Sequence, residues 1–544
     1  MSVNGLMGFE NGVVAANHPL VAEASLKILR DGGNVVDAAV AASFMMGVVV
    51  PATSGLGGGG FMTIRLAEGP TSFIDYREVA PIKASPDMYV TAGTLNLLPL
   101  HGEGEVRRMA NRIGHRAVAV PGALAGLSLA LDEYGSLSLG EVIRPAIAAA
   151  RGGFEVNPFM SSITKEDWDD SLLKLRNFTN LSEIFLRDGR PYEAGERMVR
   201  RDLAETYEKI ARVGCDAFYR GEIAELIARD MEEHGGLITE RDLDGYRPAL
   251  REPVSGTYRG HEITSSPPPS SGGTHIIQIL NILEGFDVSG LGHNTPAAIH
   301  LLCEVMKRAY ADRSRYMADP DFASIPLRGL LSKGYAEELR EQVDADGLSM
   351  EVGPGNPIAH EGGETATFCV ADGEGNMVAM SETVECFFGS GVVVPGTGIL
   401  LNDEMHDFDP RPGNPNSIEP GKRPLSSMSP TTITREGRPL LCFASTGGRR
   451  IISSSVQIIN NILGHGLSIQ DAISAPRFFH AEGDVINVES QIPRSVRRAL
   501  ETMGYRIEVE GPYMFGAASG TSIDEGGRLH AGVDPRRQYA AMGY

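Results

Sequence analysis

Three long segments of the chain carry apolar residues at the spacing of an α-helix. In residues 18–31 apolar side chains recur every three or four positions, which predicts a helix that ends at Gly32-Gly33. Residues 34–50 are apolar at nearly every position, a pattern typical of a helix buried on most sides. Residues 296–317 predict a long amphipathic helix, whose polar face carries Lys307, Arg308, Asp312 and Arg315. We expect that charged face to be a solvated or salt-bridged surface.

Shorter segments rich in β-branched and aromatic residues predict strands. Residues 61–66 (FMTIRL) follow the glycine run Gly55-Leu-Gly-Gly-Gly-Gly60, and residues 440–445 (LLCFAS) precede Gly447-Gly448. A phosphate-binding loop follows a strand and opens a helix, whereas the first glycine run follows a helical pattern and opens a strand. The run therefore indicates close packing of backbones rather than nucleotide binding.

The most informative junction lies before Thr365. Residues 351–364 combine glycine, proline and acidic residues with few large apolar side chains, so we expect an exposed, mobile loop. Residues 365–372 and 377–383 flank a glycine- and asparagine-rich turn, which by composition predicts a β-hairpin. A cut between this loop and the first strand would create a new N-terminal threonine.

Composition narrows the class of protein without identifying it. The 544 residues are 42% hydrophobic and 22% charged, as in globular proteins, and 65 of them are glycine. The formal net charge of −21 argues against binding to nucleic acid or to anionic membranes. The sequence contains no apolar stretch of membrane-spanning length and no visible secretory signal. Its five cysteines include no C-x-x-C pair, so we expect a cytoplasmic protein without a disulfide framework.

Several common catalytic centres are disfavoured. His261 and His275 lack a histidine partner four residues away on a helix, and no G-x-S-x-G motif is present. We therefore expect neither a metal nor another cofactor. What remains is Ser426-Ser427, the pair Gly447-Gly448 after a strand, and a potential N-terminal threonine. A glycine pair at a strand end can direct backbone N–H groups at an oxyanion, so together these residues suggest an amidase.

With these residues in view, the chain resembles the gamma-glutamyltransferase family of N-terminal nucleophile hydrolases nearly from end to end. The matching motifs are Gly57-Gly-Gly-Gly-Phe-Met62, Asp75-Tyr-Arg-Glu-Val-Ala-Pro81, Val120-Pro-Gly122, Pro267-Pro-Pro-Ser-Ser-Gly-Gly273, Tyr310-Ala-Asp-Arg313, Gly398-Ile-Leu-Leu-Asn402, Arg423-Pro-Leu-Ser-Ser-Met-Ser-Pro430 and Gly447-Gly448. The resemblance implies an α+β fold, a four-layer αββα sandwich. It also implies an autoprocessed enzyme that hydrolyses or transfers the γ-glutamyl group of glutathione and related small amides through an acyl-enzyme.

By the same resemblance, the precursor cuts itself between Glu364 and Thr365. Residues 1–364 would form a large subunit and residues 365–544 a small one, which remain together as one folded heterodimer; a higher oligomer stays open. The new amine of Thr365 can act as base for its own hydroxyl, the threonine variant of an activated nucleophile. The resemblance assigns support of the nucleophile to Thr383 and the oxyanion hole to Gly447 and Gly448.

The remaining assignments by resemblance concern the donor. Arg77 matches the arginine that binds the γ-glutamyl α-carboxylate, and Ser426 and Ser427 match its serine partners. Asp407 matches the acid that binds the α-amino group, with Glu404 nearby at another position used for that amine.

One departure from the family leaves the donor open. Glu385 stands where the family carries an asparagine that contacts the amino-acid end of the donor. A carboxylate about 4 Å from a substrate carboxylate costs roughly 4 kcal/mol at an effective dielectric near 20, unless Arg77 pairs with it. The segment 409–421 is also short beside lid-bearing members. Relatives that act on oxamate or on acylated β-lactams therefore remain alternatives, and a non-catalytic binding protein is a distant one.

Overall fold

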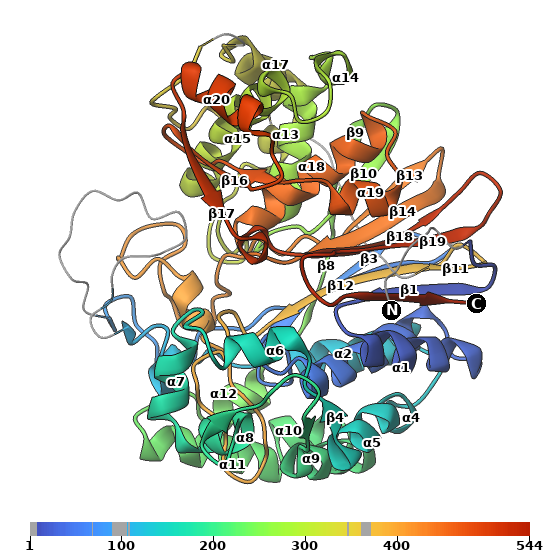
Figure 1. Ribbon diagram of the computed structural model, residues 1–544. Helices are drawn as coiled ribbons and strands as arrows, with labels where there is room; N and C mark the ends of the chain where they lie inside the picture. Colours follow the sequence, from blue (N-terminus) through green and yellow to red (C-terminus); the bar gives the residue numbers. More distant parts are fainter. Residues whose placement is uncertain (1–7, 68, 90–105, 107–108, 345–346, 361–370) are drawn as a thin grey trace.

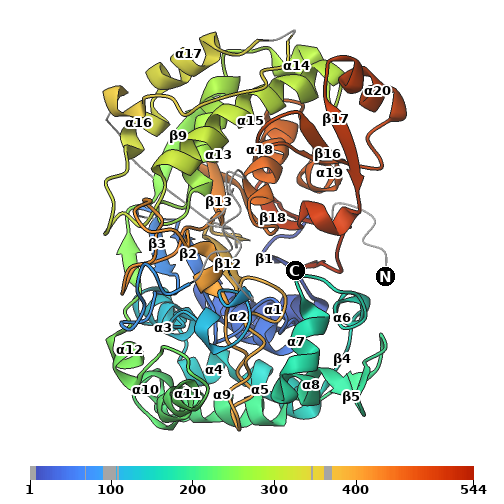
Figure 2. The same ribbon diagram turned by 90° about the vertical axis from the view of Figure 1, so that its left-hand side faces the viewer.

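The computed structural model describes residues 8–67, 69–89, 106, 109–344, 347–360 and 371–544 (Figure 1). The expected cleavage site, Glu364 and Thr365, lies outside the described residues. Two layers of β-sheet stack face to face at the centre of the molecule, and helices cover the outer face of each (Figures 1 and 2). This is the α+β, four-layer αββα arrangement that the resemblance implied.

One central layer is a six-stranded antiparallel sheet. Its strands, in order across the sheet, are β19 (Leu529–Val533), β18 (Ala518–Ile523), β14 (Arg438–Ser445), β13 (Thr431–Arg435), β10 (His261–Ser265) and β9 (Val254–Tyr258). Its outer face packs against α13 (Gly272–Leu283), α15 (Pro296–Tyr316), α18 (Arg450–Leu463) and α19 (Ile469–Ser474). Their apolar side chains form one continuous hydrophobic core with those of the sheet.

The other layer consists of two smaller antiparallel sheets. One contains β12 (Met377–Thr383), β2 (Gly59–Arg65), β3 (Ser72–Tyr76) and β8 (Ala249–Arg251); the other contains β11 (Ala371–Asp372), β1 (Gly12–Ala16) and β20 (Ala540–Gly543). The helices on their outer side include α1 (Pro19–Arg30), α2 (Val35–Val49), α3 (Ala123–Tyr134), α5 (Arg144–Gly152) and α9 (Arg201–Val213). These elements bury a second hydrophobic core.

Shorter elements surround this frame. The remaining α-helices are α4 (Leu139–Val142), α6 (Pro158–Ile163), α7 (Ser171–Asn177), α8 (Thr179–Phe185), α10 (Asp216–Tyr219), α11 (Glu222–Glu233), α12 (Glu240–Gly245), α14 (Val288–Leu291), α16 (Leu327–Leu331), α17 (Lys333–Glu341) and α20 (Arg494–Thr502). The short strands are β4 (Phe154–Glu155), β5 (Leu186–Arg187), β6 (Arg190–Pro191), β7 (Arg197–Met198), β15 (Phe478–Phe479), β16 (Val485–Glu489) and β17 (Arg506–Glu510). The 3-10 turns include η2 (His115–Ala117), η3 (Pro357–His360), η4 (Glu404–Asp407) and η5 (Pro512–Phe515).

The three helices expected from apolar spacing are confirmed as α1, α2 and α15. Helix α2 begins with a capping box, in which the Asn34 side chain accepts from the backbone and Asp37 accepts the Asn34 N–H at 2.8 Å. Reciprocal capping satisfies N–H groups that the first turn leaves unpaired. Among the described residues, none of the helices combines the length and the apolar character that a bilayer-spanning segment needs.

Of the solvated or salt-bridged surface expected along α15, the salt bridges are present, but most of the charged face is buried rather than solvated. Lys307, Arg308 and Asp312 are buried, and Arg315 is the exposed member of the four. The carboxylate of Glu304 pairs with Lys307 at 2.5 Å and with Arg308 at 3.2 Å, which offsets the cost of burying these charges. The backbone oxygens of Ser349 and Gln342 also accept hydrogen bonds from Lys307 and Arg308, so the segment that follows α17 covers this face.

The predicted strands 61–66 and 440–445 are confirmed as β2 and β14. Residues 365–370 of the predicted hairpin lie outside the described residues; in the described part, β11 pairs with β1 and β12 pairs with β2. The turn itself is present: the Asp372 N–H donates to the Asn376 oxygen at 2.9 Å. The β12–β2 ladder runs without interruption from Met377↔Arg65 to Thr383↔Gly59.

The loop expected before the cleavage site is described up to His360. Residues 351–356 have no regular structure and are mostly exposed, and η3 follows them. Exposure in this part agrees with the expectation, and the mobility of the loop stays a prediction.

Candidate active site

A cavity of about 1320 Å³ opens between the two central layers. It brings together most of the site residues expected from the sequence, which come from β12, the loops after β12 and before β13, and the turn after β14. Those that line it are Thr383, Glu385, Asp407, Ser426, Ser427, Gly447 and Gly448. Arg77 and Glu404 are fully buried beside Asp407, to which Arg77 donates a hydrogen bond.

Close backbone contacts fix the position of Thr383 at the end of β12. A methyl group placed on Gly58 would lie 2.0 Å from the Thr383 backbone oxygen, and one on Gly57 would lie 2.0 Å from that of Leu400. Only glycine permits this approach, so the expected close packing of the glycine run is confirmed. The Thr383 Oγ accepts a hydrogen bond from the Glu385 N–H at 2.8 Å. The hydroxyl is thereby held at the cavity wall.

The pair Gly447-Gly448 forms the turn between β14 and α18. Both residues have positive φ, +120° and +55°, which glycine adopts without steric cost. In the described part of the structure, neither of their N–H groups donates a hydrogen bond, although both residues line the cavity. The N-terminus of α18 follows directly and adds a partial positive charge. This arrangement suits the binding of an oxyanion.

The guanidinium of Arg77 is the centre of a buried charge cluster. Its Nη1 lies 2.8 Å from Glu404 and 3.7 Å from Glu78, and its Nη2 donates to Asp407. Backbone oxygens of Pro424 and Leu425 accept further hydrogen bonds from it. Burial alone disfavours the cation, but the surrounding carboxylates hold the pKa of Arg77 above its ordinary value.

Glu385 adds a further carboxyl group to this cluster. Its carboxyl oxygens share a group with those of Glu404 and Asp407 in which the nearest oxygens lie within 4.8 Å of one another. The Glu385 backbone has a φ of +75°, which is unusual outside glycine and turns the residue out of the β12 strand path into the cavity wall. Glu385 is therefore part of the candidate donor site, and it does not point elsewhere.

One guanidinium cation, that of Arg77, lies among the four carboxyl groups of Glu78, Glu385, Glu404 and Asp407. Burial raises the pKa of Glu385 well above its ordinary range, and the neighbouring Asp407 raises it further. Burial likewise raises the pKa of Glu404, against the opposing effect of Arg77, and raises that of Glu78 to about 8. At neutral pH Glu78 therefore favours its protonated form, and the raised pKa values of Glu385 and Glu404 shift both groups in the same direction. A protonated Glu385 can donate a hydrogen bond, which a carboxylate cannot.

Ser426 and Ser427 line the cavity directly after Pro424 and Leu425, whose backbone oxygens accept from Arg77. The Ser426 Oγ accepts from the Met428 N–H at 3.1 Å, and the Ser427 Oγ accepts from the Arg313 guanidinium at 3.1 Å. Arg313 is buried and also donates to Ser271, so its guanidinium holds the Ser427 hydroxyl in place on the side away from the cavity. Arg313 belongs to the motif at residues 310–313, which supported the resemblance of the chain to the family. The sequence alone indicated no role for Arg313 itself.

Two other acids of the site were missed by sequence reasoning. Glu382, directly before Thr383, lines the cavity and accepts hydrogen bonds from Ser43 at 2.6 Å and Tyr76 at 3.3 Å. Burial raises its pKa to about 7. Glu78 adjoins Arg77 in the sequence. Neither has a distinctive spacing, because it is burial that makes their chemistry unusual.

Three groups of side chains have the composition of a metal site within the described residues. Two of them, Glu385–Cys386–His406 and Glu385–Glu404–Asp407, share Glu385 with the cavity. The Arg77 guanidinium already supplies a cation to the second group. The third group, His115–Asp230–His234, has none of its residues in the cavity wall.

The chain is similar to known proteins over nearly its whole length. The family model described as Gamma-glutamyltranspeptidase matches residues 21–544. The chain is 40% identical to the glutathione hydrolase proenzyme of Escherichia coli (strain K12) over 97% of its own length and 90% of that protein. It is also 40% identical to the acylase ACY 1 proenzyme of Pseudomonas sp. (strain SE83), over 95% and 91% of the two chains.

A solved structure agrees in fold. The cephalosporin acylase from Bacillus halodurans aligns with a TM-score of 0.88 and 29% identity, over 100% of this chain and 98% of the other. The four layers therefore correspond to those of a known N-terminal nucleophile hydrolase.

Proposed function

The chain belongs to the gamma-glutamyltranspeptidase family, and on that premise we propose that it is an autoprocessed N-terminal threonine enzyme acting on γ-glutamyl amides such as glutathione. The proposal rests on one cavity, which has the Arg77–Asp407 ion pair beside it and the Gly447-Gly448 turn in its wall. In the described residues, the N–H groups of both glycines donate no hydrogen bond within the protein. The names of its relatives, a glutathione hydrolase and an acylase, indicate amide hydrolysis as the shared chemistry.

Activation would be cleavage of the Glu364–Thr365 bond. The resulting pieces of 364 and 180 residues would remain associated, because strands from both sides of the cut pair within the same sheets. β11 and β12 pair with β1 and β2, and β13 pairs with β10. The proenzyme names of the relatives are consistent with a processed two-subunit enzyme; further assembly is not needed for the site.

In the proposed reaction the Thr365 amine accepts the proton of the Thr365 hydroxyl as the oxygen attacks the amide carbon. The carbonyl electron pair moves onto oxygen, where the N–H groups of Gly447 and Gly448 stabilise it. The ammonium then protonates the leaving amine as the C–N bond breaks, which leaves an ester on Thr365. Water yields the acid product, and an acceptor amine yields a new amide. Thr383 would position the nucleophile.

The Arg77 cluster would bind the amino-acid end of the donor. Its α-carboxylate would interact with Arg77 and with the hydroxyls of Ser426 and Ser427, and its ammonium with Asp407 and Glu404. Glu385, when protonated, would donate to the same carboxylate, as an asparagine amide would. The adjacent residue pair Ser427–Arg313 would keep this wall rigid.

A second candidate is a changed acyl donor, favoured by the same Glu385. In its ionised form this carboxylate would repel a donor carboxylate, and Arg77 already has Glu404 and Asp407 as partners. Donors such as oxamate or an acylated β-lactam would then replace γ-glutamyl amides. A non-catalytic binding protein has no comparable support, because the oxyanion turn and Thr383 are both in place.

Two measurements test the proposal. Denaturing electrophoresis should separate pieces of 364 and 180 residues, and Thr365→Ala should leave one band. An uncut, inactive wild-type protein would refute the mechanism. Mass spectrometry of the acids released from a panel of amides then identifies the donor. If a γ-glutamyl anilide is cleaved by Glu385→Asn and not by the wild type, the changed-donor candidate is correct.

A further inference from the structure

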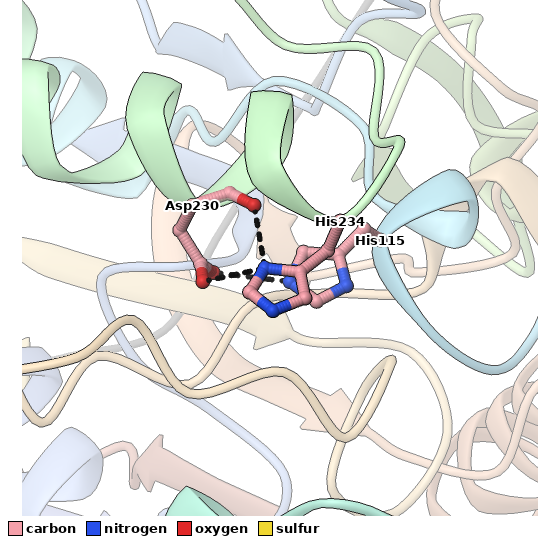
Figure 3. Close-up of side chains that lie close together, drawn as sticks. All are labelled: His115, Asp230 and His234. Carbon is pink, nitrogen blue, oxygen red and sulfur yellow. Dashed lines mark hydrogen bonds and ion pairs between the residues drawn. The ribbon is translucent and has the colours of Figure 1, made fainter.

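His115, Asp230 and His234 come together on the helical side of the molecule, away from the cavity wall (Figure 3). Asp230 lies in α11 and His234 directly follows its last residue, whereas His115 begins the distant turn η2. The expectation that the chain holds no metal rested on the lack of a histidine pair on one helix. Here the second imidazole comes from another part of the chain, so no sequence spacing could reveal it.

Both imidazoles place a ring nitrogen close to the Asp230 carboxylate, and the His234 Nδ1 also contacts the Asp230 backbone oxygen at 2.9 Å. The His115 Nε2 lies 3.1 Å from one Asp230 oxygen, and the His234 Nδ1 lies 3.2 Å from the other. The two rings stack with centroids 4.6 Å apart and planes 14° apart. Tetrahedral zinc with bonds of 2.0–2.1 Å separates its ligand atoms by about 3.3 Å. The two nitrogen–oxygen distances are close to this length but reach different oxygens of Asp230, so the His234 ring must turn for both nitrogens to bind one ion.

Two glycines allow the backbone that carries His115 to lie close to the end of α11. A methyl group on Gly236 would lie 3.0 Å from the His115 Cβ and 2.3 Å from the Met231 sulfur. Gly235 adopts a φ of +73°, which ends α11 and turns the chain away. Because both positions lack side chains, η2 can lie directly against the end of the helix.

Charge and access also favour a cation here. His234 is the C-cap of α11, where the carbonyl ends of the helix give a partial negative charge. The Asp230 side chain is 7% exposed and that of His115 is 12% exposed, whereas that of His234 is 53% exposed. Two ligands are thus held in place, and the third can rotate toward an ion that arrives from solvent.

From this geometry we propose that His115, Asp230 and His234 form a binding site for a divalent transition-metal ion of the zinc class. Two imidazoles and one carboxylate are ligands that zinc accepts, with water in the fourth position. Binding requires each ring nitrogen that faces Asp230 to be free of its proton, so each neutral imidazole carries its proton on the other nitrogen. No bond is made or broken beyond these proton shifts and the coordinate bonds.

The site would connect α11 to the chain segment that carries Arg112, Gly114 and His115. Three residues before His115, Arg112 lines the active-site cavity, pairs with Asp170 at 3.3 Å and contacts the Cys386 sulfur at 3.6 Å. The Gly114 N–H donates to Ser390 at 2.8 Å. A bound ion would therefore tie α11 to the segment that forms one wall of the cavity, and its role would be structural.

Zinc titration of the metal-stripped full-length protein, in competition with a chromogenic chelator, tests the proposal. We expect one tight site per chain, whose affinity falls at least about tenfold in His115→Gln and in His234→Gln. His465→Gln is the matched control, because it removes one ring of a histidine pair, His293 and His465, that is in no group of potential ligands among the described residues. Its affinity should equal that of the wild type.

Cobalt substitution distinguishes this site from the one at Cys386. Visible ligand-field bands without a near-ultraviolet thiolate band are expected, because no sulfur is a ligand. A thiolate band, an absence of tight binding in the wild type, or unchanged affinity in His234→Gln would each overturn the proposal. His234 is half exposed, so His234→Gln should fold even if His115→Gln does not, and circular dichroism checks both.

Discussion

Replacing Glu385 by glutamine should change how donor binding depends on pH. The carboxyl oxygens of Glu385, Glu404 and Asp407 lie within 4.8 Å of one another around Arg77, with Glu385 half-buried at the cavity wall. Because burial raises the pKa of Glu385, the wild-type side chain is a neutral hydrogen-bond donor until the pH exceeds that raised pKa. Glutamine has nearly the same shape and is neutral at every pH. The two enzymes should therefore behave alike in acid and diverge in alkali.

An upper limit for the difference in kcat/KM between the two enzymes can be calculated. A donor carboxylate 4.8 Å from an ionised Glu385 would be repelled by about 3.5 kcal/mol at an effective dielectric of about 20. That free energy corresponds to about 300-fold in kcat/KM. With a chromogenic γ-glutamyl anilide, the ratio of kcat/KM for Glu385→Gln to that of the wild type should start near one. It should then rise toward this limit as the pH increases.

The ratio isolates Glu385, since titration of the nucleophile is common to both enzymes. Exposed Glu374→Gln serves as the matched control and should follow the wild type at every pH. A 4-aminobutyryl anilide, which keeps the amine and lacks the carboxylate, should not show the rise. If the ratio is independent of pH with the γ-glutamyl anilide, Glu385 does not face the donor carboxylate and the reasoning fails.

Three further outcomes are expected. The wild-type precursor should lose stability as the pH rises from about 4.5 to about 7, because Glu382 ionises at lower pH in the unfolded chain than in the folded one. In urea unfolding of Thr365→Ala protein, Glu382→Gln should reduce this loss by up to about 3 kcal/mol. Equal dependence of the unfolding free energy on pH with and without Glu382→Gln would contradict this. Gly58→Ala should lower the rate of self-cleavage at least about 100-fold, because its methyl group collides with the Thr383 oxygen, whereas Gly152→Ala, with open space around it, should cleave normally on a time-course gel. Asp407→Asn should lower kcat/KM for the γ-glutamyl anilide at least about tenfold by removing a charged hydrogen-bond partner, and a wild-type value would exclude Asp407 from donor binding.

Local patterns predicted the elements of this fold well, and partners distant in sequence account for what they missed. The continuous apolar run that defines α2 and the Gly447-Gly448 turn after β14 are each complete within a short stretch of sequence. By contrast, the polar face of α15 is buried because Gln342, Ser349 and Tyr505, encoded later, contact Arg308 and Lys307. The pairing of β12 depends in the same way on a distant partner, since β2 lies far earlier in the chain.

The candidate site divides in the same way. The resemblance assigned Arg77, Asp407 and the serine pair, and the structure places them around one cavity wall. It could not indicate that Glu78 and Glu382 are titratable near neutral pH, because a raised pKa follows from burial, and burial depends on the whole fold. The roles of Thr365 and its neighbours remain predictions.

Because the two proposed subunits share β-sheets, unfolding should inactivate the mature enzyme differently from its precursor. An uncut chain regains β12–β2 and β13–β10 pairing by an intramolecular search, at any protein concentration. Once cut, two separate molecules must find each other, so recovery after unfolding becomes second order and fails in dilute solution. Heat or denaturant would then inactivate the mature form permanently under conditions from which its precursor recovers, and the lifetime of the enzyme would be set by its unfolding rate rather than by an equilibrium.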